Sequence, residues 1–161
     1  MKKIVTHINP DLDAVCGVWL IKKFLPGWEE AEVGFAEAES TTEEKPQTDK
    51  EPDVLFVDVG RGKLDHHQSA EYSSATKLTW DYIQSIREGE PLSELDSQAI
   101  ERMVEVVNQI DNATDLTWPE VRDDRFHFYL HNLVEGLRGL AFSDSMVMEE
   151  GFKMLNVVLL N

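Results

Sequence analysis

The sequence predicts a single α/β domain over residues 1–161, with a mostly parallel sheet, helices on both of its faces and a helical C-terminal half. Two observations predict this class. In the first third of the chain, short runs rich in β-branched residues alternate with a helical pattern, as in a βαβ unit. From residue 74 onward, apolar residues recur at helical spacing instead. At 161 residues the chain is long enough to build one sizeable core.

The first half of the chain holds the expected strands. Short apolar runs predict them at residues 4–6, 32–36 and 54–57. A helix over residues 14–25 joins the first two strands, and Pro26 and Gly27 end it. Residues 39–53 are rich in Glu, Thr, Lys and Pro, which predicts an exposed loop. A Gly-rich turn after the third strand then leads to a short fourth element at Leu64.

The second half is expected to be helical. Apolar residues at helical spacing predict helices over residues 74–87, 93–110, 125–140 and 143–160. Ser93 and Ser143 are plausible N-caps of two of these helices, and Pro91 and Pro119 mark breaks between them. The last residues, 154–161, are apolar and have no polar tail. They predict packing in the core, a homodimer interface or a cut from a longer parent chain, and the sequence leaves all three open.

The charge balance limits the partners that this chain can bind. It holds 31 acidic and 15 basic residues, which give a formal charge of −16. This charge argues against long duplex nucleic acid, which needs clustered Lys and Arg, and favours a small phosphorylated molecule or a short oligonucleotide held by metal. The single Cys16 agrees with a reducing cytoplasmic location. The longest uncharged apolar stretch, residues 14–21, is too short for a membrane span.

Two motifs directly follow predicted strands, and they carry the chemistry. They are His7-x-x-x-Asp11-x-Asp13 and Asp58 followed by Asp65-His66-His67. Because ligands gather at the carboxyl ends of parallel strands, these side chains are expected to share one pocket. Like charges about 4 Å apart repel by about 1 kcal/mol in water and by about 4 kcal/mol at an effective dielectric of 20. Carboxylates and imidazoles without thiolate therefore predict two divalent cations, with Mn²⁺ preferred and Mg²⁺, Fe²⁺, Co²⁺ or Zn²⁺ allowed.

The motifs resemble those of the DHH phosphoesterase superfamily, which takes its name from the triplet seen here at residues 65–67. Asp58 matches the family's Asp that closes a hydrophobic strand, and Asp111 matches its Asp after a helix. Only six residues separate Asp58 from Asp65. This short spacing resembles the branch that contains the melanocyte proliferating gene exonuclease. The resemblance covers about residues 3–115, and the family's usual second, substrate-binding domain is not recognisable in this chain.

The resemblance implies a Rossmann-like fold and a role for each motif residue. His7 and Asp11 would hold one cation, Asp13, His66 and Asp111 the other, and Asp58 would bridge them. His67 would meet the substrate phosphate or the leaving-group oxygen, and Asp65 would orient a histidine. Asp11 is also a plausible N-cap of the first helix. Arg61 and Lys63 are candidate phosphate-binding residues, although a solvated turn explains them equally well.

The resemblance implies a two-metal phosphoesterase that hydrolyses a phosphodiester, phosphomonoester or phosphoanhydride in a small or short nucleotide-like substrate, as nucleases and phosphodiesterases do. The alternatives are a metal-binding but catalytically silent module that needs a partner or a missing domain, and an acidic domain whose motifs are structural only. His127 and His131 lie four residues apart, a spacing that can bind metal. Their aromatic neighbours favour a partly buried, hydrogen-bonded pair instead.

Overall fold

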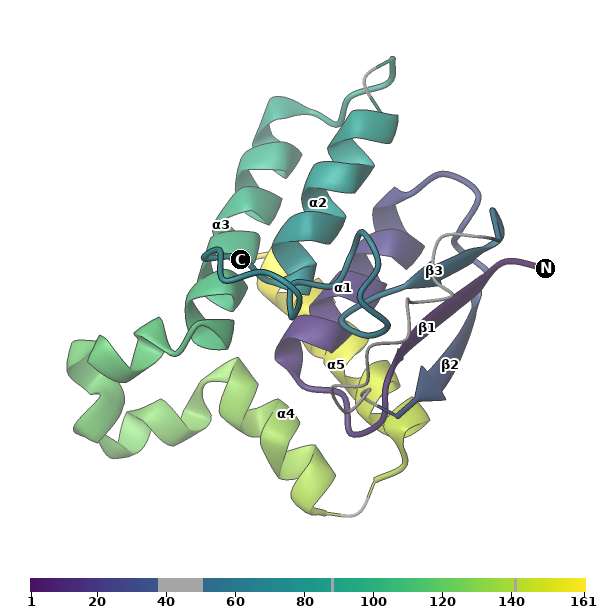
Figure 1. Ribbon diagram of the computed structural model, residues 1–161. Coiled ribbons are helices and arrows are strands. Elements are labelled where there is room, and N and C mark those ends of the chain that lie inside the picture. The colour runs from purple at the N-terminus through teal and green to yellow at the C-terminus, as the bar shows by residue number, and fades with distance from the viewer. Residues whose placement is uncertain (38–50, 88, 141) are drawn as a thin grey trace.

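The computed structural model describes residues 1–37, 51–87, 89–140 and 142–161. In this part of the chain a three-stranded parallel sheet lies beside five α-helices, which confirms the predicted α/β class (Figure 1). The strands are β1 Lys3–His7, β2 Glu32–Ala36 and β3 Val54–Phe56. The α-helices are α1 Leu12–Phe24, α2 Ala75–Ile86, α3 Glu94–Asp111, α4 Leu130–Gly139 and α5 Asp144–Leu159. Three short 3₁₀ turns, η1 Thr114–Thr117, η2 Pro119–Arg122 and η3 Asp124–Phe128, join α3 to α4.

The sheet has the order β2-β1-β3, so β1 is its central strand. Val5 of β1 pairs with Phe56 of β3, and the Val57 N–H donates to the Val5 carbonyl at 2.8 Å. Because the strands are parallel, their carboxyl ends lie at the same edge. Continuing this register by two residues brings His7 beside Asp58. The pairing of two strands that are about fifty residues apart in sequence therefore places the two motifs together.

Helix α1 forms the centre of the core. Ten of its 13 residues are buried, so it is apolar around most of its circumference, as expected of a helix covered on several sides. It packs on β1, and α2 and α5 pack on it from other sides (Figure 1). Gly17 and Gly151 allow two of these close approaches, toward Val57 and Val15 respectively. Cys16 is fully buried in this core.

Three of the four helices predicted for the second half are confirmed nearly to their ends. The side chains of Ser74, Ser93 and Ser143 each accept a hydrogen bond from a backbone N–H in the first turn of α2, α3 and α5. Such caps satisfy N–H groups that have no partner inside the helix. Ser93 and Ser143 are the N-caps that the sequence predicted, and the cap at Ser74 was not predicted. The first helix begins at Leu12, two residues earlier than predicted, because Asp11 is its N-cap.

The helix predicted over residues 125–140 was wrong in its first part. Residues 124–128 form the 3₁₀ turn η3, Tyr129 is extended, and α4 begins only at Leu130. Phe126 is buried and lies 5.3 Å from the Tyr129 ring and 5.1 Å from the His131 ring, measured between centroids. The Asn132 side chain donates to the Phe126 carbonyl, which gives this carbonyl a hydrogen-bond partner at the break. Aromatic packing therefore prevails over the helical pattern here.

The remaining expectations have mixed outcomes. Leu64 forms an isolated parallel bridge with Val57, which agrees with a short fourth element. Most of the loop predicted over residues 39–53 lies outside the described residues, and residues 51–53 are exposed. Helix α1 packs on the sheet, whereas helices on its second face stay a prediction. None of the helices in the described residues combines the length and apolarity needed to cross a membrane.

Replacing Gly151 by Ala tests the packing of α5 on α1. An added Cβ would lie 2.5 Å from Val15 Cγ1, and the β-branched valine cannot easily rotate away. We expect Gly151→Ala to lower the free energy of unfolding by about 1–3 kcal/mol through overpacking. Urea denaturation followed by circular dichroism measures this change.

Gly136 in α4 provides the matched control, since an added Cβ there has no heavy atom within 4 Å. Gly136→Ala should raise the free energy of unfolding by about 0.5–1 kcal/mol, because alanine loses less backbone entropy than glycine on folding. Equal stability of Gly151→Ala and the wild type would show that α5 does not approach α1 this closely.

Candidate metal centre

His7, at the end of β1, faces two carboxylates. Its Nε2 lies 3.2 Å from Asp58 Oδ2 and 3.9 Å from Asp11 Oδ1. Its Nδ1 donates to the Ile8 carbonyl at 2.8 Å, which leaves Nε2 directed at the acidic side chains. Asp11 also caps α1, since its Oδ1 accepts from the Ala14 N–H at 3.1 Å. His7, Asp11 and Asp58 thus form one compact group of ligand atoms within 4.8 Å of one another.

His66 is the centre of a second group. Its Nε2 lies 3.3 Å from Asp111 Oδ2, at the end of α3, and 3.9 Å from Asp13 Oδ2, at the start of α1. The ligand atoms of Asp13, His66 and Asp111 also lie within 4.8 Å of one another. The fold therefore brings together all six residues that the sequence nominated as metal ligands. They form two groups of the composition that the resemblance implied, and a third group of ligand atoms, from Asp58, His66 and His67, overlaps both.

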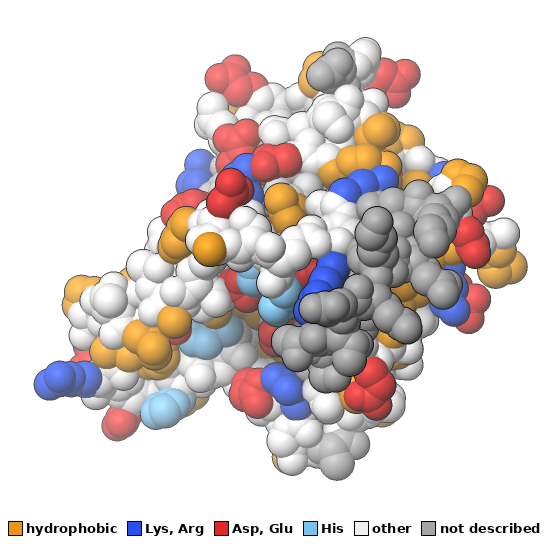
Figure 2. Space-filling view, in the orientation of Figure 1, with side chains coloured by type: hydrophobic (Ala, Val, Ile, Leu, Met, Phe, Trp, Pro, Cys, Tyr) orange, Lys and Arg blue, Asp and Glu red, His pale blue; other side chains and the backbone are white. Residues whose placement is uncertain are grey.

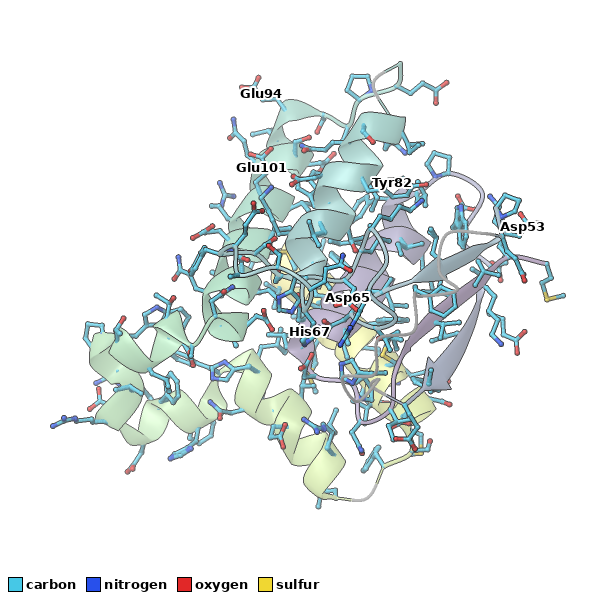
Figure 3. The ribbon with its side chains drawn as sticks, in the orientation of Figure 1. Asp53, Asp65, His67, Tyr82, Glu94 and Glu101 are labelled. Atoms are coloured by element: carbon cyan, nitrogen blue, oxygen red, sulfur yellow. The ribbon has the colours of Figure 1, made fainter. Side chains whose placement is uncertain are left out.

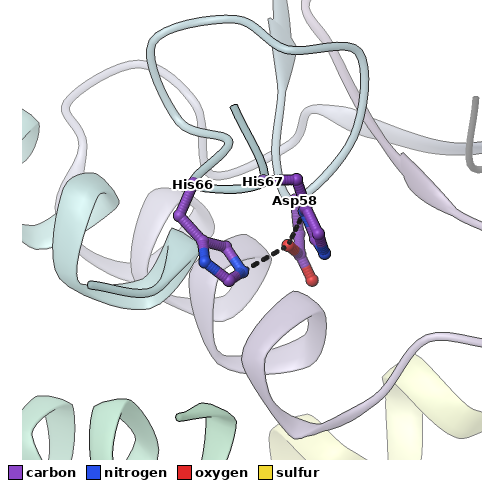
Figure 4. A group of neighbouring side chains, drawn as sticks. All are labelled: Asp58, His66 and His67. Carbon is purple, nitrogen blue, oxygen red and sulfur yellow. Dashed lines mark ion pairs between the residues drawn. The ribbon is translucent and has the colours of Figure 1, made fainter. Parts of the chain in front are cut away.

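Asp58 belongs to the His7 group and also contacts both histidines of the triplet (Figure 4). Its Oδ2 faces His7, whereas its Oδ1 is 3.5 Å from His66 Nε2 and 3.4 Å from His67 Nδ1. The residue is only 3% exposed and has a φ of 58°, in the left-handed region that non-glycine residues rarely adopt. Backbone strain of this kind costs about 1–3 kcal/mol and concentrates at functional sites. This conformation allows one carboxylate to face both groups.

Asp13 is held by the N-terminus of α2. Its two carboxylate oxygens accept from the backbone N–H groups of Ala75 and Thr76 at 2.7 and 2.8 Å. The Thr76 hydroxyl donates to the Asp13 carbonyl at 3.0 Å. An anion is stabilised at this end of a helix, where N–H groups lack partners inside the helix. Sequence analysis missed this contact, although Ser74 marked the helix start from which the donors come.

Asp65 orients His67, the second histidine of the triplet. Asp65 Oδ1 lies 2.8 Å from His67 Nδ1 and accepts from the His67 N–H, while Oδ2 accepts from the Arg61 N–H at 2.6 Å. Asp65 is 3% exposed, whereas 60% of the His67 side chain is exposed. Both lie near the centre of the view in Figure 3. The predicted orienting role of Asp65 fits this geometry, and Nε2 of His67 is left for an outside partner.

The basic residues of the turn between Asp58 and Asp65 contribute differently. Arg61 has a φ of 55° and meets Asp65 through its backbone N–H. Lys63 lies over the Tyr82 ring, 4.2 Å from its centroid. Phosphate binding by Arg61 stays a prediction.

The proton affinities of the two groups show how the negative charge is balanced. Burial alone would lower the pKa of His7, but its contacts with Asp58 and Asp11 raise it to about 9. Contact with Asp58 likewise raises the pKa of His66 to about 9. Burial, together with the charges of Asp58 and Asp111, raises the pKa of Asp13 to about 7. Without a cation, protons thus supply the positive charge that these carboxylates need.

The pKa values of the other acidic groups are set by the same two effects, burial and neighbouring groups. Burial raises the pKa of Asp111 to about 6. Burial would also raise the pKa of Asp58, but His66 and His7 outweigh it and hold this pKa below its usual range. The hydrogen bonds of Asp65 likewise overcome its burial and lower its pKa, and its carboxylate raises the pKa of His67.

Three buried atoms of this cluster make no hydrogen bond within the described chain: Asp58 Oδ1, His66 Nε2 and Asp111 Oδ2. Buried polar atoms almost always have a partner, so their convergence calls for one. Two acidic oxygens and an imidazole nitrogen are suitable ligands for Mn²⁺, Fe²⁺ or Zn²⁺. All three atoms lie around His66, so the donor set at this group fits a divalent cation.

A cavity of about 300 Å³ opens beside the cluster. Asp11, Asp13 and Asp111 line one side of it, and His131, Asn132 and Glu135 of α4 line another. Figure 2 shows histidine and acidic side chains gathered near the middle of this face. Sequence analysis did not identify α4 as a wall of the site, because no local pattern connects residues 131–135 to the motif at residues 7–13, more than a hundred residues earlier.

His127 and His131 do not form a metal pair. His127 is exposed on η3, whereas His131 belongs to α4. His131 Nε2 lies 2.9 Å from Asn132 Nδ2 and 3.7 Å from Asp115 Oδ2. The partly buried, hydrogen-bonded arrangement that the aromatic neighbours favoured thus holds for His131 alone.

Comparisons with protein-family models, with curated proteins and with solved structures found no match to this chain. The functional argument therefore depends on the geometry of the cluster itself.

We expect Mn²⁺ to stabilise the fold, because it would replace protons among crowded carboxylates. At a Mn²⁺ concentration about 100 times its Kd, the free energy of unfolding should increase by about 2.7 kcal/mol. For a chain of this length that corresponds to an increase in Tm of about 5–10 °C, measured by differential scanning fluorimetry. A chelator should reverse the shift, and NaCl at matched ionic strength should not reproduce it. An unchanged Tm at millimolar Mn²⁺ would contradict a metal centre.

Proposed function

We propose that this chain is a DHH-type, Rossmann-like domain that hydrolyses a phosphoester or phosphoanhydride with two divalent cations, Mn²⁺ preferred. The observation that carries the proposal is the position of Asp58, whose two oxygens face two separate groups of candidate ligands. A bridging carboxylate of this kind fixes the separation of two cations.

The roles of the residues follow from their contacts. His7 and Asp11 would hold one cation, and Asp13, His66 and Asp111 would hold the other, with Asp58 shared. When bound, the two cations supply Lewis acidity that activates water and offsets the charge of the reacting phosphate. Asp13 is kept in place by the α2 N-terminus, so its carboxylate is pre-positioned.

His67 is the residue placed to move a proton. Asp65 holds its Nδ1, so the exposed imidazole presents Nε2 toward an incoming molecule. We propose that Nε2 donates its proton to the oxygen of the leaving group, while Asp65 stabilises the imidazolium before transfer. Asp65 is then a positioning residue for His67.

The proposed substrate is a small phosphorylated molecule or a short oligonucleotide. The strongly acidic chain disfavours a long duplex, and the cavity of about 300 Å³ suits a compact group. A cytoplasmic location and a homodimer built on the apolar end of α5 are further parts of the proposal. Val157 and Leu160 there are 60% and 88% exposed.

The variant Asp58→Asn tests the bridge, because asparagine tolerates the same left-handed backbone but lacks the charge. We expect the loss of at least one of two bound Mn²⁺ ions, measured by elemental analysis. We also expect turnover to fall by at least about 100-fold, since two-metal stabilisation contributes several kcal/mol. Suitable substrates are the dinucleotide pApA, short oligonucleotides, inorganic pyrophosphate and a chromogenic phosphodiester.

Asp53→Asn is the matched control, because Asp53 is exposed just before β3 and Asp58 follows the other end of this strand. The control should keep both ions and full turnover. An Asp58→Asn protein with two ions and full turnover would contradict the bridging assignment. Two bound ions in the wild type without turnover on any substrate would favour the catalytically silent module.

The variant His67→Gln separates proton donation from metal binding. We expect turnover to fall by about 10²–10⁴-fold on substrates with an alkoxide leaving group, which needs a proton. On p-nitrophenyl esters, whose leaving group is stable as an anion, the loss should stay below about tenfold. The bound Mn²⁺ should be unchanged.

His127→Gln on exposed η3 is the control and should behave as the wild type on both substrate classes. Equal losses on both leaving groups would reject His67 as the proton donor, and a lost Mn²⁺ ion would identify it as a ligand instead.

A further inference from the structure

A second cavity, of about 510 Å³, lies between α3, α5 and the segment before α4. Its size is within the usual range for small-molecule sites. Most of its lining is apolar, including Met103, Val106, Trp118, Tyr129, Leu155 and Val158. The cavity plays no part in the metal centre described above. An apolar pocket of this volume is a site for an apolar group of limited size.

This apolar cavity adjoins the cavity at the metal centre. Leu12, Val107, Ile110 and His131 line both. Leu12 lies between the candidate ligands Asp11 and Asp13 in sequence, and Ile110 directly precedes Asp111. These four shared residues make the two cavities neighbours. A molecule with its phosphate at the cluster has an apolar site immediately beside it.

His131 offers a hydrogen-bond donor at this boundary. Asn132 Nδ2 donates to the Phe126 carbonyl at 2.8 Å and lies 2.9 Å from His131 Nε2. If Nε2 accepts from Asn132, the ring proton of the neutral form is on Nδ1, whereas Asp115 Oδ2, 3.7 Å from Nε2, favours a proton on Nε2. Burial lowers the pKa of His131, which favours this neutral form, although Asp115 opposes the shift. Nδ1 is buried and has no hydrogen-bond partner in the described residues, so an acceptor from outside would satisfy it.

We infer that the substrate is an organic phosphate with an aromatic ring, such as a nucleobase, and that the ring occupies this apolar cavity while the phosphate lies at the metal centre. This inference rests on the proposed function and adds the substrate class. Trp118 and Tyr129, whose ring centroids are 6.1 Å apart, both line the cavity and supply aromatic surface for the ring. His131 Nδ1 donates to an oxygen of the group that joins ring and phosphate. Inorganic pyrophosphate lacks the ring and is a poor substrate.

The test uses phosphonates, which keep the anionic head but are not hydrolysed. Methylphosphonate, benzylphosphonate and naphthylmethylphosphonate differ only in apolar area. In Mn²⁺-loaded protein, calorimetric titration should show naphthylmethylphosphonate binding at least about tenfold more tightly than methylphosphonate. A chelator should weaken all three, because the phosphonate lies at the metal centre.

The double variant Met103→Gln with Val106→Asn makes the cavity polar without adding charge. Both residues are at least partly exposed on α3, so the helix tolerates them. The affinity for naphthylmethylphosphonate should then exceed that for methylphosphonate by only about threefold or less. Leu95→Gln on the same helix, at a residue that is 79% exposed and outside both cavities, is the control and should keep the full difference in affinity.

Four results would overturn the inference. Equal affinity for all three phosphonates in Mn²⁺-loaded protein would reject the ring subsite and leave the proposed function intact. If the double variant still binds naphthylmethylphosphonate at least about tenfold more tightly than methylphosphonate, the ring lies elsewhere. Sedimentation showing a dimer that the double variant dissociates would identify a second copy as the occupant. Absence of bound Mn²⁺ together with absence of phosphonate binding would reject the proposed function as well.

Discussion

The charge of the carboxylates around Asp58 is the constraint on which the rest of the site depends. Asp13 and Asp58 are each 3% exposed, and Asp111 is half-buried beside them. Their repulsion in a site of low dielectric is worth several kcal/mol, so positive charge must enter with them. Without cations, protons on His7 and His66 meet this need. A cation in each group would meet it as well, and three buried polar atoms of the cluster make no hydrogen bond within the described residues.

The fold makes this crowded arrangement possible. The parallel register of β1 and β3 fixes His7 beside Asp58, and the N-terminus of α2 holds the carboxylate of Asp13 through two backbone N–H groups. Each of these contacts depends on close packing around α1, where Gly17 meets Val57 of the strand end that carries Asp58. The core therefore supplies the rigidity that keeps like charges together. Packing of the core therefore determines both the stability of the fold and the geometry of the site.

Local signals in the sequence predicted much of this arrangement. Ser74, Ser93 and Ser143 marked helix starts, and strand-end positions together with the two motifs nominated five of the six residues of the two groups. Asp111 was nominated only by the resemblance. Contacts between distant segments were not predictable in this way. Three such features depend on tertiary packing. Thr76 binds the Asp13 carboxylate, aromatic contacts of Tyr129 interrupt the predicted helix, and His131 lies beside the cluster. The proposed substrate preference was not predictable from local signals either, since both cavities are built from segments that meet only in the folded chain.

Anomalous scattering from crystals soaked in Mn²⁺ tests the central claim most directly, because it locates the ions without reference to activity. The account predicts two strong peaks that share Asp58. One should lie among His7, Asp11 and Asp58, and the other among Asp13, His66 and Asp111. A map with no peak at the cluster, or with peaks only at exposed acidic residues, would contradict the claim that this fold assembles a two-metal centre.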